Sequence, residues 1–160
     1  MNKAYLLIGG NKGNREEFLR AARSEIEVAC GPVVQQSSLY ETAAWGLEDQ
    51  PAFLNQALAI ETALTADELL KNILHIEEKL GRVRDVKYGP RVIDIDILFF
   101  NAAIIHQQNL MIPHPQLQNR RFVLVPLNEI APDFFHPVFQ KTVAQLLAEC
   151  PDPLDVQKIS

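Results

Sequence analysis

The fold is decided by one stretch of the chain, Val92-Ile93-Asp94-Ile95-Asp96-Ile97-Leu98-Phe99. Apolar and acidic residues alternate along it at a period of two, which is the repeat of a β-strand. The pattern predicts a strand over residues 92–100, with Asp94 and Asp96 on one face. The opposite face, which is expected to lie against the core, carries Ile93, Ile95, Ile97 and Phe99.

Apolar runs and helical repeats surround this strand. Runs rich in apolar or β-branched residues predict further strands at 4–8, 33–40 and 53–61. Apolar residues at helical spacing predict helices over 15–29 and 65–80. Strands that neither alternate strictly with helices nor cluster apart favour a mixed-connection α+β sheet.

Polar residues mark where the helices begin. Asn14 can cap the first helix, and Thr65 with Glu68 forms the pattern of a capping box at the second. The glycines that start at Gly9 are expected to end the first strand in a tight turn. Thr142 is expected to begin the last helix.

Length and composition favour one domain spanning residues 1–160, because 48% hydrophobic residues suffice for a single core. Residues 151–160 are expected to form a loosely held tail. The net charge of −5 includes no basic excess, so we expect no nucleic acid partner. The early apolar run 4–8 is too short to cross a membrane, so we expect no membrane insertion. Cys30 and Cys150 match no metal or redox motif and are expected to be buried free thiols in a cytoplasmic protein.

Asp94 and Asp96 are candidate metal ligands. Residues two apart on one side of a strand have Cα atoms about 6.5 to 7 Å apart, so their carboxylates can converge on one or two hard cations such as Mg²⁺. Two such ions would stabilise the attacking and leaving oxygens of a phosphoryl displacement. A solvated polar sheet face explains the same pattern equally well when the strand is considered alone.

The ten residues before this strand, 82–91, contain four cationic side chains and one acidic side chain. Arginine binds phosphate oxygens in pairs and keeps its charge, so Arg82, Arg84 and Arg91 are candidates for binding a triphosphate. The alternative, a solvated basic loop, is the commoner fate of such runs. Residues 9–13 do not match a Walker phosphate loop, so any ATP would be held by metal ions and arginines.

Eight motifs follow one another along most of the chain: Leu7-Ile8-Gly9-Gly10-Asn11, Tyr40-Glu41-Thr42, Asp49-Gln50-Pro51-x-Phe53-Leu54-Asn55, Gly81-Arg82-Val83-Arg84, Tyr88-Gly89-Pro90-Arg91, Asp94-x-Asp96, Pro113-His114-Pro115 and Asn119-Arg120-x-Phe122. Together they resemble the 6-hydroxymethyl-7,8-dihydropterin pyrophosphokinases of folate synthesis. The resemblance implies an α+β domain with three α/β/α layers, in which helices cover both faces of a ferredoxin-like, largely antiparallel sheet.

The resemblance also implies a reaction, in which the pterin hydroxyl attacks the β-phosphorus of ATP and AMP leaves. Two Mg²⁺ ions would be held by Asp94 and Asp96, and Arg82 and Arg91 would act with these aspartates in catalysis. The nucleotide would be bound by Arg84, His114 and Arg120, and the pterin by Thr42, Trp45, Phe53, Asn55 and Phe122.

The residues alone leave other functions open. Asp-x-Asp binds nucleotide phosphates in unrelated metal-dependent nucleotidyl and glycosyl transferases. A non-catalytic α+β interaction module would use both aspartates only as a solvated sheet face, with His114 as a structural histidine and Phe53 and Phe122 as ordinary core residues. The resemblance favours a monomer that acts on small molecules.

Overall fold

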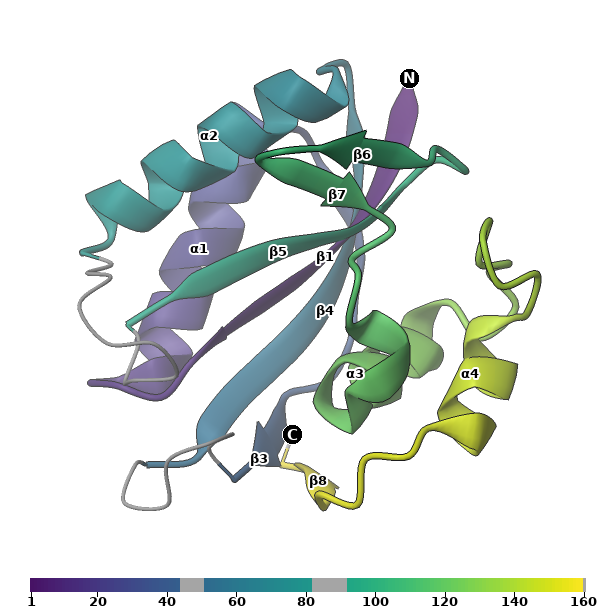
Figure 1. The fold of residues 1–160 in the computed structure, drawn as a ribbon. Coiled ribbons are helices and arrows are strands. Elements are labelled where there is room, and N and C mark those ends of the chain that lie inside the picture. The colour runs from purple at the N-terminus through teal and green to yellow at the C-terminus, as the bar shows by residue number, and fades with distance from the viewer. Residues whose placement is uncertain (44–50, 82–91, 160) are drawn as a thin grey trace.

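A six-stranded sheet forms the centre of the molecule, in the strand order β5-β1-β4-β3-β8, and β2 also pairs with β4 (Figure 1). The computed structural model describes residues 1–43, 51–81 and 92–159. Every pairing in this sheet is antiparallel, as the resemblance implied. The strands are β1 (Asn2–Gly10), β2 (Val33–Gln36), β3 (Tyr40–Thr42), β4 (Phe53–Thr62), β5 (Asp94–Phe100) and β8 (Val156–Lys158), and β6 (Ile105–Gln107) with β7 (Leu110–Ile112) forms a separate hairpin.

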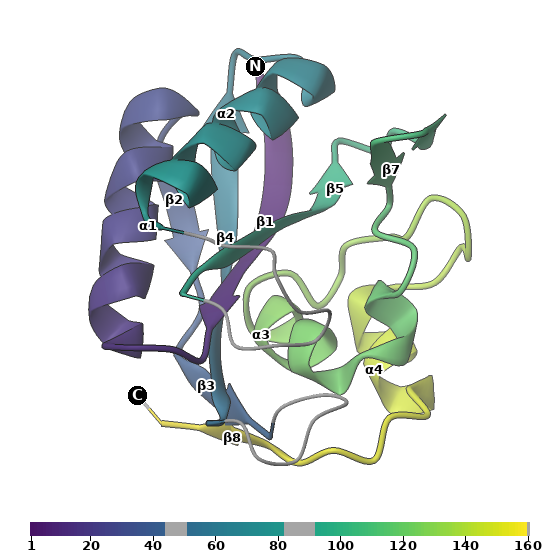
Figure 2. The same cartoon turned by 60° about the vertical axis from the view of Figure 1, so that its left-hand side comes forward.

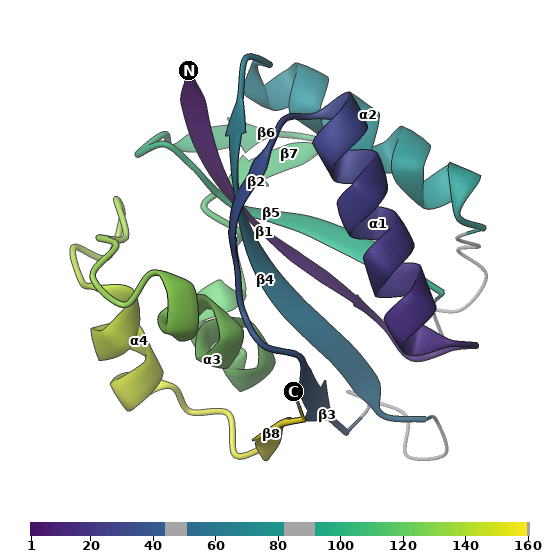
Figure 3. The same ribbon diagram turned by 180° about the vertical axis from the view of Figure 1, so that it is seen from behind.

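Helices cover both faces of the sheet, so the predicted three-layer arrangement is confirmed (Figures 1 and 3). On one face lie α1 (Arg15–Ala29) and α2 (Ala66–Lys79), whose apolar side chains share a core with the sheet. On the other lie α3 (Arg121–Ile130) and α4 (Val143–Glu149), which form a second core with the opposite side of the strands. A short 3₁₀ turn, η1 (Leu117–Asn119), leads into α3.

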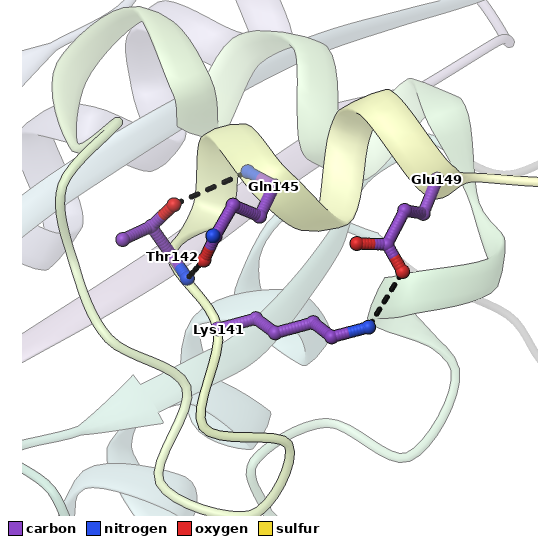
Figure 4. A network of polar contacts seen from close by, with 4 residues as sticks. All are labelled: Lys141, Thr142, Gln145 and Glu149. Atoms are coloured by element: carbon purple, nitrogen blue, oxygen red, sulfur yellow. Dashed lines mark hydrogen bonds and ion pairs between the residues drawn. The ribbon is translucent and has the colours of Figure 1, made fainter.

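The predicted helix caps are present. The Asn14 side chain accepts the Glu17 N–H at the start of α1, and Thr65 forms a capping box with Glu68 at the start of α2. Thr142 caps α4 in the same way: its hydroxyl accepts the Gln145 N–H at 3.2 Å, and the Gln145 side chain accepts the Thr142 N–H at 2.8 Å (Figure 4). These bonds satisfy N–H groups that the first turn of a helix leaves without partners.

Two strand boundaries differ from the prediction. The glycines do not end the first strand, because β1 continues to Gly10 and Gly9 pairs with Asn55 of β4. The predicted strand 33–40 is interrupted at Ser37, whose hydroxyl accepts the N–H of Ala57 and takes the place of a backbone acceptor. A side chain that competes with the backbone for a ladder bond can break a strand in this way.

The prediction that Phe99 shares a face of β5 with Ile93, Ile95 and Ile97 is wrong. The register of β5 against β1 shifts between Tyr5 and Leu6, so that Tyr5 lies opposite Phe99 and Leu6 lies opposite Ile97. Leu98 is therefore an extra residue in a β-bulge, which reverses the alternation beyond it. Ile93, Ile95 and Ile97 lie in the core under α1 and α2 as predicted, whereas Phe99 lies in the core under α3 and α4.

The end of the chain is paired rather than loosely held. Residues 156–158 form β8, which adds to the sheet beside β3. Composition could not reveal this pairing, because it depends on a partner strand more than one hundred residues earlier. In residues 1–43, 51–81 and 92–159, no helix is long and apolar enough to span a membrane.

Candidate functional site

Asp94 and Asp96 stand at the start of β5 on the face that α3 covers further along. Asp96 lies opposite Leu7 of β1, which belongs to the core under α3 and α4, and Asp94 lies opposite Gly9. Both aspartates are half-buried, whereas Ile95 between them is buried on the other face. Two carboxylates on this face, two residues apart along the strand, form a pair of oxygen donors.

A buried glutamate that the sequence did not predict holds this part of β5. Glu77 of α2 is only 3% exposed, and its carboxylate accepts the Ile95 N–H at 2.7 Å. Among the described strands, β5 is the last on its side of the sheet, so this N–H points away from β1 and has no strand partner within that part of the chain. The sequence does contain a signal, because residue 77 lies four positions after Ile73 on the apolar side of the helix.

The register of three strands sets a second group of polar residues on the same face. Gly9 is paired with Asp94 on one side and with Asn55 of β4 on the other. Adjacent strands lie about 4.8 Å apart, so Asn55 and Asp94 stand roughly 10 Å apart across the sheet. A Cβ on residue 9 would lie 1.9 Å from Oδ1 of Asn55, so the Asn55 side chain leans over the glycine.

Thr42 and Phe53 continue this group toward the edge of the sheet. They lie opposite each other in the β3–β4 pair, two residues along each strand from the pairing of Tyr40 with Asn55 and therefore on the same face. Thr42 is buried, and its hydroxyl is without a hydrogen-bond partner among the described residues. Asn55 is 5% exposed, and Phe53 is half-buried. An unsatisfied buried hydroxyl costs free energy unless a ligand supplies its partner.

His114 lies close enough to Asp94 and Arg120 for their charges to act on it. Its pKa is lowered to about 4, first by burial and then by the Arg120 guanidinium, while Asp94 opposes the shift. Nδ1 of His114 accepts the Gln116 N–H at 3.2 Å, so the neutral ring carries its proton on Nε2. The guanidinium of Arg120 lies 5.9 Å from the centre of the Phe122 ring. Phe122 is the second residue of α3, after Arg121.

A hollow of about 300 Å³ extends from Asp96 toward the β6–β7 hairpin. Its walls come from α2, β5, the hairpin and the segment that follows it, through Leu70, Ile97, Gln108, Met111 and His114 among others. The hollow combines apolar walls with a carboxylate, an imidazole and side-chain amides. This composition is typical of a small-molecule site.

Four predicted site residues lie outside the described ranges: Trp45, Arg82, Arg84 and Arg91. Within those ranges, His, Cys, Asp and Glu side chains nowhere gather in a group of three or more that could hold a metal ion. Asp94 and Asp96 therefore offer a pair. A pair suits Mg²⁺, which usually keeps several waters and binds one or two carboxylates together with substrate phosphates.

Comparison with known proteins identifies the family. The sequence model described as "7,8-dihydro-6-hydroxymethylpterin-pyrophosphokinase (HPPK)" matches residues 5–132. The 2-amino-4-hydroxy-6-hydroxymethyldihydropteridine pyrophosphokinase of Methylorubrum extorquens is 43% identical over 160 residues, which cover 99% of either chain. The Bacillus subtilis protein of the same name is 47% identical over 130 residues, covering 81% of this chain and 78% of that one. The chain belongs to the HPPK family.

The fold of this HPPK-family chain is also similar to that of a solved bifunctional protein. The Plasmodium falciparum HPPK-DHPS wild-type structure with STZ-DHP matches with a TM-score of 0.76 and 20% identity. The match covers 92% of this chain but 43% of the Plasmodium chain, so the chain spans less than half of that protein. All site residues predicted from sequence lie within the HPPK match at 5–132.

Proposed function

We propose that this chain transfers a diphosphate group from ATP to 6-hydroxymethyl-7,8-dihydropterin, and that the reaction takes place on the sheet face that carries Asp94 and Asp96. Membership of the HPPK family supports the reaction, which belongs to folate biosynthesis and uses ATP as co-substrate. One structural observation supports the place. The strand register sets both aspartates, Asn55 and the paired Thr42 and Phe53 on one face of one sheet.

The nucleotide occupies the hollow between Asp96 and the β6–β7 hairpin. Its phosphates lie toward Asp94 and Asp96, which would hold two Mg²⁺ ions, and toward Arg120 and the Nε2–H of His114. At this place Mg²⁺ would supply positive charge beside the phosphates. His114 is neutral at neutral pH because its pKa is about 4, so it serves as a hydrogen-bond donor rather than as a cation.

The pterin lies toward β3 and β4. Its ring stacks between Phe53 and Phe122, and its polar edge pairs with Asn55 and with the Thr42 hydroxyl, which has no hydrogen-bond partner among the described residues. A site built to pair such an edge discriminates against analogues that lack it, because its buried polar groups are then left unmatched. The family resemblance adds Trp45, which lies outside the described residues, to this group as a prediction.

The residues act mainly by positioning and charge. The hydroxyl oxygen of the pterin forms a bond to the β-phosphorus of ATP, and the hydroxyl proton is released. The bond between the β-phosphorus and the oxygen that bridges the α- and β-phosphates breaks. AMP leaves with that bridging oxygen. Arg82, Arg84 and Arg91 neutralise the charge that develops on the phosphates. The protein works as a monomer in the cytoplasm, where ATP and reduced pterins are available.

One assay tests the reaction. Purified protein incubated with ATP, Mg²⁺ and the hydroxymethyl dihydropterin is expected to yield AMP and the pterin diphosphate. Formation of ADP, or no turnover, would overturn the proposal. Asp96→Asn removes a charge from the metal pair without changing the side-chain shape and is expected to abolish Mg²⁺-dependent ATP binding. Asp133→Asn, at an exposed residue between α3 and α4, removes the same charge and should bind ATP normally.

A further inference from the structure

Asp152 connects the end of the chain to the helix that carries Phe122. It is 7% exposed, and its two carboxylate oxygens accept one N–H each: Oδ2 accepts that of Arg121 and Oδ1 that of Leu154, both at 3.0 Å. Arg121 is the first residue of α3, and Arg120 before it makes no side-chain cap. Asp152 therefore caps α3 from a distant segment, and its charge favours the positive end of the helix.

The residues that follow Asp152 lead directly to β3. In β8, Val156 lies opposite Thr42 and Lys158 lies opposite Tyr40, and just beyond the strand the Ile159 N–H donates to the Leu39 carbonyl at 2.9 Å. Figure 2 shows this segment running from α4 past the end of α3 to lie beside β3. β3 has three residues and would be an edge strand without β8. By pairing with it, β8 gives β3 a neighbour on its second side.

The same segment thus ties together two parts of the chain that contribute to the proposed pterin site. Phe122 follows the capped residue of α3, and Thr42 lies in the strand that β8 pairs with. The far end of α3 is also tied to β3, because Glu129 accepts hydrogen bonds from the Ser38 N–H and from the Tyr40 hydroxyl. Without Asp152, α3 would keep the hydrogen bonds of Glu129 at its far end, but its first turn would lose the bond from the Arg121 N–H.

We propose that Asp152 is a positioning residue for the acceptor site: by capping α3 and anchoring β8, it fixes the distance between Phe122 and Thr42. This inference rests on the proposed function. A shift of the first turn of α3 moves the Phe122 ring with the backbone, because that side chain has only two torsions. Arg120 reaches its partners through a longer, flexible side chain, which can compensate for such a shift.

Two variants test the proposal, Asp152→Ala and Asp152→Asn, and the second retains one of the two acceptor oxygens. Asp152→Ala is expected to raise the dissociation constant of the pterin about tenfold, measured with a non-hydrolysable ATP analogue and Mg²⁺ present. Asp152→Asn should lie between Asp152→Ala and the unaltered chain. The dissociation constant of the ATP analogue should change less than about threefold, which separates positioning of the acceptor from general loss of structure.

Asp155→Asn is the matched control, because Asp155 lies in the same segment and its carboxylate accepts a hydrogen bond from the exposed Gln157 side chain. It removes the same charge and should bind the pterin normally. Hydrogen exchange reports the cap directly: the Arg121 and Leu154 amides should exchange faster in the Asp152 variants only. If Asp152→Ala does not fold, Asp152→Asn decides the question by the same measurements.

Two results would overturn the inference in different ways. Unchanged pterin affinity in an Asp152 variant whose Arg121 amide has lost protection would show that the cap does not position the acceptor site. Failure of the unaltered chain to bind the pterin at all would instead refute the proposed function, and the inference with it.

Discussion

The Asn55 side chain occupies the place where a Cβ on Gly9 would stand, with 1.9 Å between that position and Oδ1 of Asn55. The sequence marks Gly9 as a turn glycine, but its role in the structure is to leave room for its partner across the strand pair. Real Cβ atoms do not approach an oxygen so closely, so one of the two groups would have to move if residue 9 had a side chain.

Gly9→Ala is therefore expected to displace Asn55 and to weaken pterin binding by about tenfold, because a displaced amide no longer meets the polar edge of the ligand. The measurement is a titration of the pterin in the presence of an ATP analogue. A double-mutant cycle with Asn55→Ala provides the control. If Gly9→Ala weakens binding equally in that background, the clash with Asn55 is not the cause.

Glu77→Leu is expected to destabilise the fold by about 1 to 3 kcal/mol, because it leaves the buried Ile95 N–H without an acceptor. Glu77→Gln keeps an acceptor oxygen and should cost less. Urea unfolding measures the free energy, and hydrogen exchange of the Ile95 amide shows the local effect. Glu78→Leu, at the exposed neighbouring position, is the control. Full protection of the Ile95 amide in Glu77→Leu would contradict the role assigned to this carboxylate.

Because of His136, the free energy of unfolding is expected to decrease in mild acid. It is 2% exposed, its Nδ1 accepts the N–H groups of Val138 and Phe139, and burial lowers its pKa. The folded protein therefore binds this proton less readily than the unfolded chain, whose histidine titrates near 6.5. The stability that neutral His136 provides is fully present above that pH and falls as the pH decreases toward the folded-state pKa, by at most about 1.4 kcal/mol per pH unit.

His136→Asn tests this pH dependence, because its side-chain oxygen can accept the same two N–H groups and does not titrate. Urea unfolding at pH 7 and pH 5 should show a smaller loss of free energy for the variant than for the unaltered chain. His114, whose pKa is also lowered, contributes equally to both proteins and cancels in the comparison. An identical loss in both would exclude His136 as the source.

Thr142→Ala is expected to lower the free energy of unfolding by about 1 kcal/mol through loss of the α4 capping box. For a domain of this size that corresponds to a fall in melting temperature of about 2 to 4 °C. Lys141 beside it pairs with Glu149 at 2.6 Å, but both side chains are exposed, so Lys141→Ala should change the stability by less than about 0.5 kcal/mol (Figure 4). A larger effect at Lys141 than at Thr142 would reverse this ranking.

Local patterns predicted the parts of the fold that local forces determine. The caps at Asn14, Thr65 and Thr142 and the alternating start of β5 depend on neighbours a few residues away, and all of them are present in the structure. The family motifs also named the residues that the register brings onto one face.

Features that depend on distant partners were not predicted. The bulge at Leu98 appears only when β5 is paired with β1, and the cap that Asp152 provides joins segments about thirty residues apart. Glu77 shows an intermediate case. Its position on the apolar side of α2 is a signal that the sequence contains, but the backbone N–H that it binds belongs to a strand whose edge could not be placed from sequence.

The bulge in β5 has a consequence for attempts to transplant the Asp-x-Asp strand. Before Leu98 the residues facing α3 are the aspartates, and after it the same face carries Phe99 in the core. A strand with the same sequence but paired in unbroken register would have the correct carboxylates, but it would turn Phe99 toward α1 and α2. The portable unit is therefore the strand together with its irregularity, since the extra residue keeps Phe99 on the face that begins as a ligand surface and continues as packed interior.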